Sequence, residues 1–165
     1  MKELLEKISS YNLFNYLFPG AVFVFILKTI MDITLTNDNI FESFFIYYFI
    51  GLIMSRIGSL IIEPLVTKTK WFKYAPYSDY LNASKKDTKI ELFTEVNNMY
   101  RTLLSTTIVL FFIDVFLLIY SWPVPLQKLL RVFFLAMLML LFLSSYKKQT
   151  DYVKKRITNA IQQEN

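Results

Sequence analysis

The stretch YNLFNYLFPGAVFVFIL, residues 11–27, is almost continuously apolar, yet it carries two asparagines and a Pro-Gly pair near its start. Extended to Met31, it is about as long as an α-helix must be to cross roughly 30 Å of hydrocarbon. Lys2 and Lys7 precede it, as basic residues precede a secretory signal, but the following MDITLTNDN offers no small-x-small cleavage site. The stretch therefore predicts a retained membrane-spanning helix.

Three further windows of similar length are free or nearly free of charge. The composition agrees with a bilayer location, because 55% of the 165 residues are hydrophobic and only three are glycine. This is too apolar for a soluble domain of this size. The sequence therefore predicts an all-α polytopic membrane protein, formed by a single four-helix domain. The expected spans are residues 13–31, 44–62, 103–120 and 125–143.

Loop charges predict the orientation of the spans, because the cytoplasmic segments of membrane proteins are enriched in lysine and arginine. The segment at residues 63–101 and the C-terminal tail are rich in both, whereas the loop after the first span is acidic and the turn SWPVP is short. We therefore expect both termini in the cytoplasm. Lys28, Lys128 and Arg131 are exceptions, and the two lysines lie close enough to the membrane surface to reach water.

Two stretches outside the spans have helical periodicity. Pro64 is expected to end the second span, since it has no amide hydrogen to donate. Ser84 and Asp87 have the spacing of a capping box, which predicts a helix that begins there and runs into the third span. Residues 146–161 extend the fourth span as a cytoplasmic C-terminal helix. The apolar faces of these two extensions require cover from each other, from a second copy or from a partner.

Basic side chains on the two extensions are candidates for protein docking. A helix that combines an apolar stripe with a basic surface can bind an acidic soluble protein in the cytoplasm. The candidate docking residues are Lys85, Lys86, Lys89, Lys154, Lys155 and Arg156.

The segment TKTKWFKYAPYSDY, residues 67–80, interleaves lysines with aromatic residues. Such a mixture beside a span usually lies at the anionic headgroup surface, with Trp71, Phe72 and Tyr74 as the interface residues. A site for an anionic ligand or for a protein partner is the alternative. Direct binding of nucleic acid is not expected, because the membrane interface already accounts for this composition.

Asp114 and Arg131 are ionisable residues inside expected spans, where a charge is costly. Asp114 lies nine residues before Pro123 and Arg131 lies eight after it. In a tight hairpin both would lie at a similar depth, about 12 Å from the turn, so they can pair. The pair could pin the third span to the fourth, or it could belong to an ion or proton path.

Arg56, Ser59 and Glu63 recur at spacings of three and four in the second span, which predicts a shared polar face. This face would point toward a neighbouring helix, an oligomer axis or a vestibule. Arg56 and Glu63 are about 10 Å apart along one helix, so each needs a partner elsewhere.

The first span offers one such partner. Pro19 cannot donate to the carbonyl of Asn15, and this free carbonyl, with the side-chain amides of Asn12 and Asn15, would form a polar notch level with Arg56 and Glu63. The alternative is a kink at the membrane surface whose free carbonyl is hydrated.

Catalytic chemistry is not indicated. The chain has neither cysteine nor histidine, so thiolate nucleophiles, imidazole or thiolate metal sites and Ser-His-Asp triads are excluded. Asp114 and Glu63 lie toward opposite membrane faces, which disfavours an aspartyl pair, and no Gly-rich phosphate loop is present. The sequence therefore predicts a protein that is not an enzyme and needs no cofactor.

The sequence SSYNLFNYLFPGAVFVFIL, residues 9–27, followed by three more spans with both ends inside, resembles the KwaA-like membrane subunits of bacterial Kiwa anti-phage systems. The resemblance covers the whole chain in topology, and its sequence-specific part is the first span. It implies a homo-oligomer, such as a tetramer, in the bacterial inner membrane. That oligomer would sense disturbance of the envelope during infection and hold a soluble partner on its cytoplasmic face. The family supplies no catalytic motif.

Two classes of function therefore remain open. In the first, the protein is a sensor and scaffold that contacts membrane lipid, other copies of itself and a soluble cytoplasmic protein. In the second, it is a channel or pore-forming effector in which Arg56, Glu63 and Asp114 line a path. The chain is also similar in outline to four-span phage-exclusion channels, which depolarise the membrane when triggered.

Overall fold

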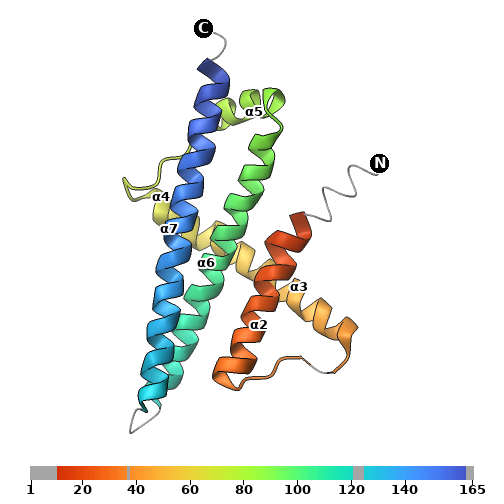
Figure 1. Ribbon diagram of the computed structural model, residues 1–165, viewed down its shortest axis with the longest axis vertical. Coiled ribbons are helices and arrows are strands. Elements are labelled where there is room, and N and C mark those ends of the chain that lie inside the picture. The colour runs from red at the N-terminus through yellow and green to blue at the C-terminus, as the bar shows by residue number, and fades with distance from the viewer. Residues whose placement is uncertain (1–10, 37, 121–124, 163–165) are drawn as a thin grey trace.

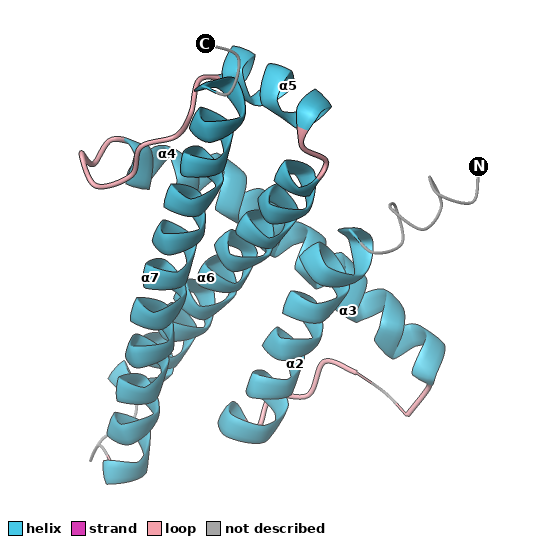
Figure 2. Ribbon diagram, turned by 45° about the horizontal axis from the view of Figure 1, so that its top comes forward, coloured by secondary structure: helices cyan, strands magenta, loops and turns pink. Residues whose placement is uncertain are grey.

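The computed structural model describes residues 11–36, 38–120 and 125–162, and within these ranges every regular element is helical. Figures 1 and 2 show their arrangement. In chain order the elements are the π-helical turn η1 (Leu13–Leu17), α2 (Phe18–Met31), α3 (Ile40–Ile57), the π-helical turn η2 (Gly58–Ile62), α4 (Glu63–Thr67), α5 (Tyr77–Lys86), α6 (Lys89–Ile119) and α7 (Leu126–Gln162).

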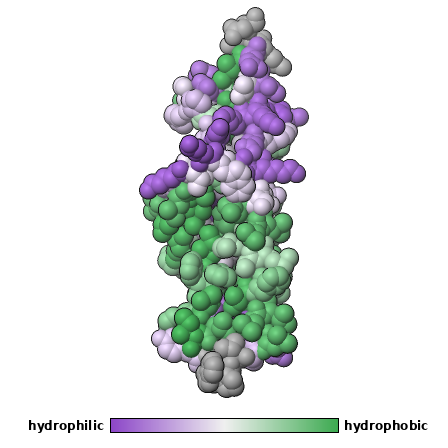
Figure 3. All heavy atoms as spheres, turned by 90° about the vertical axis from the view of Figure 1, so that its left-hand side faces the viewer, coloured by the Kyte–Doolittle hydropathy of each residue, from purple (hydrophilic) through white to green (hydrophobic). Residues whose placement is uncertain are grey.

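Four continuous helical stretches are long and apolar enough to span a membrane, which confirms the predicted all-α fold with four candidate spans. Their bounds are Leu13–Met31, Ile40–Thr67, Lys89–Ile119 and Leu126–Gln162. The last two are about 46 and 55 Å long, well beyond the roughly 30 Å of a hydrocarbon core. In Figure 3 hydrophobic residues cover the lower part of the molecule and hydrophilic residues gather above them.

Helix α6 is the centre of the packing. Helix α7 runs alongside it, and α2 and α3 contact α6 as well as each other. Helix α3 crosses the others obliquely, so that its continuation α4 emerges near α7 (Figure 1). Helix α5 lies across the polar ends of α6 and α7, which it contacts. We call α5, residues 89–101 of α6 and residues 146–162 of α7 the polar head.

Each of two prolines follows a π-helical turn. The amide of Phe18 bonds to the carbonyl of Leu13, and the amide of Glu63 bonds to that of Gly58. These wide turns let Pro19 and Pro64 enter the next helix at its start, where a missing amide hydrogen costs little. The expectation that Pro64 ends the second span is therefore wrong, because the helix continues to Thr67.

Two glycines bring the first and second spans into backbone contact. A Cβ atom on Gly20 would lie 1.7 Å from the carbonyl oxygen of Tyr47, and one on Gly51 would lie 1.7 Å from that of Tyr16. Only glycine permits so close an approach, which is common where membrane helices cross. This reciprocal contact fixes where α3 crosses η1 and α2.

Other element boundaries differ from those expected. Helix α3 begins at Ile40 rather than at residue 44, because the side chain of Asn39 accepts a hydrogen bond from the amide of Phe41 at 3.0 Å. Ser84 lies inside α5 and does not cap α6. Instead Asp87 accepts from the amide of Lys89 at 3.1 Å, and α6 begins there. The expected turn around Pro123 lies outside the described residues.

The apolar faces of the polar head are covered within the chain. Ile90 of α6 and Ile157 of α7 pack with Ala83 of α5 in one buried cluster. Closer to the spans, Leu104 and Tyr146 pack against residues from the segment that precedes α5. The extensions of α6 and α7 therefore cover each other, which is the first of the three possibilities that the sequence left open.

Candidate functional site

The deepest ionisable pair joins α6, α7 and α2. The side chain of Asp114 is fully buried and forms an ion pair with Arg131, as the hairpin spacing predicts. Arg131 also donates from Nη1 to the carbonyl oxygen of Ile30 at 2.7 Å. One guanidinium thus neutralises the carboxylate and binds the backbone near the end of α2.

The burial of this pair limits what it can do. Both carboxylate oxygens of Asp114 are shielded from water, and neither accepts a hydrogen bond of good geometry from a described residue. A carboxylate that relays ions or protons must reach water or a chain of polar groups. The geometry is that of a structural pair that pins three helices together.

A second ion pair joins Glu63, at the start of α4, to Arg101 of α6. Glu63 thereby obtains the partner that the sequence required, but from α6 rather than from the first span. Its side chain is 32% exposed and that of Arg101 is 13% exposed, so this pair is wetter than the first. The sequence interpretation had counted Arg101 only as a loop charge.

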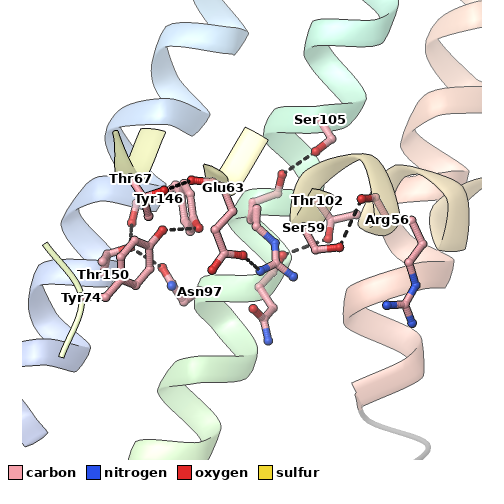
Figure 4. A network of polar contacts seen from close by, with 12 residues as sticks. Arg56, Ser59, Glu63, Thr67, Tyr74, Asn97, Thr102, Ser105, Tyr146 and Thr150 are labelled. Carbon is pink, nitrogen blue, oxygen red and sulfur yellow. Dashed lines mark hydrogen bonds and ion pairs between the residues drawn. The ribbon is translucent and has the colours of Figure 1, made fainter. Parts of the chain in front are cut away.

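Arg56 does not join this pair. Its side chain is exposed, and within the described residues it has no ion pair. Ser59 donates to the carbonyl oxygen of Arg56 at 3.1 Å. Figure 4 shows Arg56 directed away from Glu63, with the π-helical turn between them. The predicted single face of Arg56, Ser59 and Glu63 is therefore wrong, because η2 changes the direction in which successive side chains point.

The expected notch in the first span is closed. Asn15 is fully buried, and its Nδ2 donates to the carbonyl oxygen of Tyr11 at 3.2 Å. Its Oδ1 has no partner among the described residues. Asn12 is half-buried and Pro19 is buried. Because Glu63 binds Arg101 and Arg56 is exposed, neither uses Asn15 as a partner, and the prediction of a shared notch is wrong.

A cavity of about 320 Å³ lies within the polar head. Its lining includes the basic residues Arg101 and Lys154 and other polar residues of α6 and α7. Tyrosines of α5 and of the segment that precedes α5 complete the lining. Tyr74 and Tyr146 join their hydroxyls at 2.6 Å, and Thr150 donates to Asn97 Oδ1 at 3.1 Å (Figure 4). Burial raises the pKa of Tyr74, so its hydroxyl stays protonated at neutral pH.

The aromatic residues expected at the membrane surface have different environments. Trp71 is 53% exposed, whereas Phe72 is buried against Leu104 and Tyr146. Tyr74 is half-buried and bonded to Tyr146. Interface placement is therefore wrong for Phe72 and Tyr74, because both pack into the protein, and only Trp71 is available to an outer surface.

The candidate docking residues also divide into two groups. Arg156 binds Asp87 at 2.5 Å and lies over the Phe93 ring, 5.2 Å from its centroid, so it holds α7 to α6. Lys85 and Lys155 are exposed and Lys154 is half-buried, and none of the three forms an ion pair within the described residues. Lys86 and Lys89 are exposed as well.

The described residues hold no group of three or more metal-ligating His, Cys, Asp or Glu side chains. Comparisons of the chain with protein-family models, with curated proteins and with solved structures give no match. The geometry of the spans and of the polar head is therefore what supports a proposal about function.

Proposed function

We propose that the protein is a non-enzymatic multi-pass membrane scaffold whose basic polar head faces the cytoplasm and docks an acidic soluble protein. One contrast supports the proposal. The carboxylates of Asp114 and Glu63 are neutralised within the chain, whereas three lysines of the polar head form no ion pair among the described residues, namely Lys85, Lys154 and Lys155. The loop charges support the orientation.

The same contrast argues against the channel alternative. A conducting path needs polar groups that line a common water-filled space. Asp114 is fully buried, Glu63 is bound to Arg101, and Arg56 points away from both groups of this pair. Three residues with such separate environments do not define a path through one copy of the chain.

The cellular setting of the proposal comes from the likeness of the first span and the topology to KwaA-like subunits of Kiwa systems. We extend the proposal to a sensor of anti-phage defence in the bacterial inner membrane. A homo-oligomer, such as a tetramer, could form through the span portion of α7, residues 126–143. Only 11% of its most apolar window is buried within the chain, so lipid or a second copy would cover the rest.

Charge reversal at the polar head tests the docking proposal. Lys85→Glu with Lys154→Glu should abolish the salt-sensitive capture of one acidic soluble protein by the purified membrane protein, measured by cross-linking and mass spectrometry. The control is Lys68→Glu with Lys70→Glu, which reverses two exposed charges outside the polar head and should leave capture intact. Equal loss of capture in both variants would contradict a specific docking face.

The channel alternative predicts a different result in proteoliposomes. The scaffold proposal expects no potassium flux from the purified wild-type protein. Steady flux that changes with Arg56→Gln, and that persists in Lys85→Glu with Lys154→Glu, would replace the scaffold proposal with the channel.

A further inference from the structure

A second cavity, of about 770 Å³, opens where the span portion of α7 meets the polar head. Three lysines line it, together with serines 144 and 145 of α7 and aromatic residues that include Trp71 and Phe93. It is separate from the 320 Å³ cavity, because the two cavities share no lining residue. Figure 3 shows, on the side of the molecule that bears α7, the boundary between apolar and polar surface.

The depth of this cavity matches that of lipid phosphates. From Leu126, where α7 begins, to Ser144, the helix rises about 27 Å. The hydrocarbon core of a bilayer is about 30 Å thick. With Leu126 at one edge of the hydrocarbon, Ser144 and Lys148 lie at the other edge, where headgroups begin.

The charge of the cavity favours an anion. Lys147 is neutralised by Asp151, and its ammonium lies 5.8 Å from the centroid of the Trp71 ring. Lys148 and Lys155 are exposed and have no ion pair within the described residues. Lys148 therefore places one uncompensated ammonium group at headgroup depth, beside serine hydroxyls that can donate hydrogen bonds, and Lys155, about 10 Å further along α7, adds a second one to the lining of the same cavity.

An apolar track leads from the cavity into the span. Phe134, Met137 and Leu141 are 45%, 56% and 56% exposed. They precede Ser144 and Lys148 at spacings of three and four, so all five lie along one face of α7. A molecule with an anionic head and long apolar chains would contact the lysines with its head and this face with a chain.

We propose that this cavity is a selective binding site for the headgroup phosphate of an anionic glycerophospholipid, with one acyl chain laid along α7. The proposal goes beyond docking of a soluble protein, because it gives the chain a preference among the lipids that surround it. Lys148 and Lys155 attract the phosphate, and the hydroxyls of Ser144 and Ser145 donate hydrogen bonds to it. Trp71 lines the same cavity.

Trp71 provides a direct measurement. In a Trp122→Phe background it is the sole tryptophan, and lipids brominated near the headgroup end of one chain quench it on contact. In vesicles of phosphatidylcholine with phosphatidylglycerol, we expect half-maximal quenching at an approximately fivefold lower mole fraction of brominated phosphatidylglycerol than of brominated phosphatidylcholine. Equal quenching by the two lipids would overturn the proposal.

Variants separate the site from general surface charge. Lys148→Gln with Lys155→Gln should remove the preference, whereas Lys148→Arg with Lys155→Arg should retain it. Lys68→Gln with Lys70→Gln removes the same charge outside the cavity lining and should also retain it. A preference that survives Lys148→Gln with Lys155→Gln in protein of native helix content, or that is lost equally in the Lys68 and Lys70 control, would overturn the proposal.

A last arm distinguishes a lipid from a free phosphate. Inorganic phosphate and glycerol 3-phosphate carry the headgroup chemistry without acyl chains, so they should compete only weakly with brominated phosphatidylglycerol. Complete relief of quenching by millimolar glycerol 3-phosphate would identify a soluble phosphate ligand and would overturn the lipid assignment. Lys85 and Lys154 lie outside the lining of this cavity, so Lys85→Glu with Lys154→Glu should abolish protein capture and leave the lipid preference intact, which separates this proposal from the docking proposal.

Discussion

Two ion pairs hold α6 to its neighbours, and they differ most in how much water reaches them. Asp114 is fully buried beside Arg131, whereas Glu63 is 32% exposed beside Arg101. Arg101 and Asp114 are separated by about 20 Å along α6. The two pairs have the same chemistry, but loss of one partner strands a charge in an apolar interior in the first case and near water in the second.

The largest effect is expected at the buried pair. Asp114→Leu should destabilise the folded protein by about 3–5 kcal/mol, because Arg131 is left without its counter-charge. Asp114→Leu with Arg131→Leu should recover much of the loss. Reversible unfolding in mixed micelles measures both. A double variant that is no more stable than the single one would show that the pair does more than neutralise charge.

A smaller effect is expected at the wetter pair. Glu63→Gln should cost about 1 kcal/mol, because solvent can replace part of what Arg101 loses. A double-mutant cycle with Arg101→Gln, measured in the same micelles, gives the coupling energy. That energy should be well below the coupling of Asp114 with Arg131. Equal coupling energies would mean that burial does not decide between the two pairs.

The smallest effect is expected at a third pair, which lies in the polar head. The side chain of Arg156 donates a hydrogen bond to Asp87 and lowers the pKa of that carboxyl. Because the pKa of Asp87 is lower in the folded than in the unfolded protein, the ionised carboxylate stabilises the folded state at neutral pH. This stabilisation is lost as the pH falls through the folded-state pKa, which lies below the usual aspartate value of about 4.

Asp87→Asn removes this dependence and serves as the comparison. Thermal unfolding followed by circular dichroism should show the wild type slightly more stable than Asp87→Asn at pH 7, with the difference shrinking as the pH falls below the usual pKa of an aspartate. A difference that grows on acidification would contradict the assigned pairing.

Sequence reasoning predicted the four spans and the pairing of Asp114 with Arg131, because both depend on local information. Hydropathy identifies a span from its own residues, and a short turn sets two positions at equal depth. The pairing of Glu63 with Arg101 depends instead on where α3 crosses its neighbours. That crossing follows from the backbone contact at Gly20 and Gly51. No local sequence pattern predicts which residues of the other span these glycines contact.

Helix α5 could have been predicted. Pro76 precedes it, Asp79 lies in its first turn, and Lys85 and Lys86 lie in its last turn, an order that suits the helix dipole. Because lysines and aromatic residues alternate in residues 67–80, the segment was interpreted as lying at the membrane surface, and the helix was missed. The burial of Phe72 required knowledge of α7, since Tyr146 covers it from far along the chain.

The π-helical turn at Gly58–Ile62 also has a consequence for how this chain tolerates changes in length. A π-helical turn contains one residue more than the α-helical turn it replaces, and one residue corresponds to about 100° of rotation. Deletion of a single residue there would restore a regular helix and leave Glu63 at nearly the same angle to Arg101, whereas deletion of one residue in the α-helical part of the span would rotate Glu63 by about 100°. The registry of the second span is therefore set by the number of residues as well as by their identity.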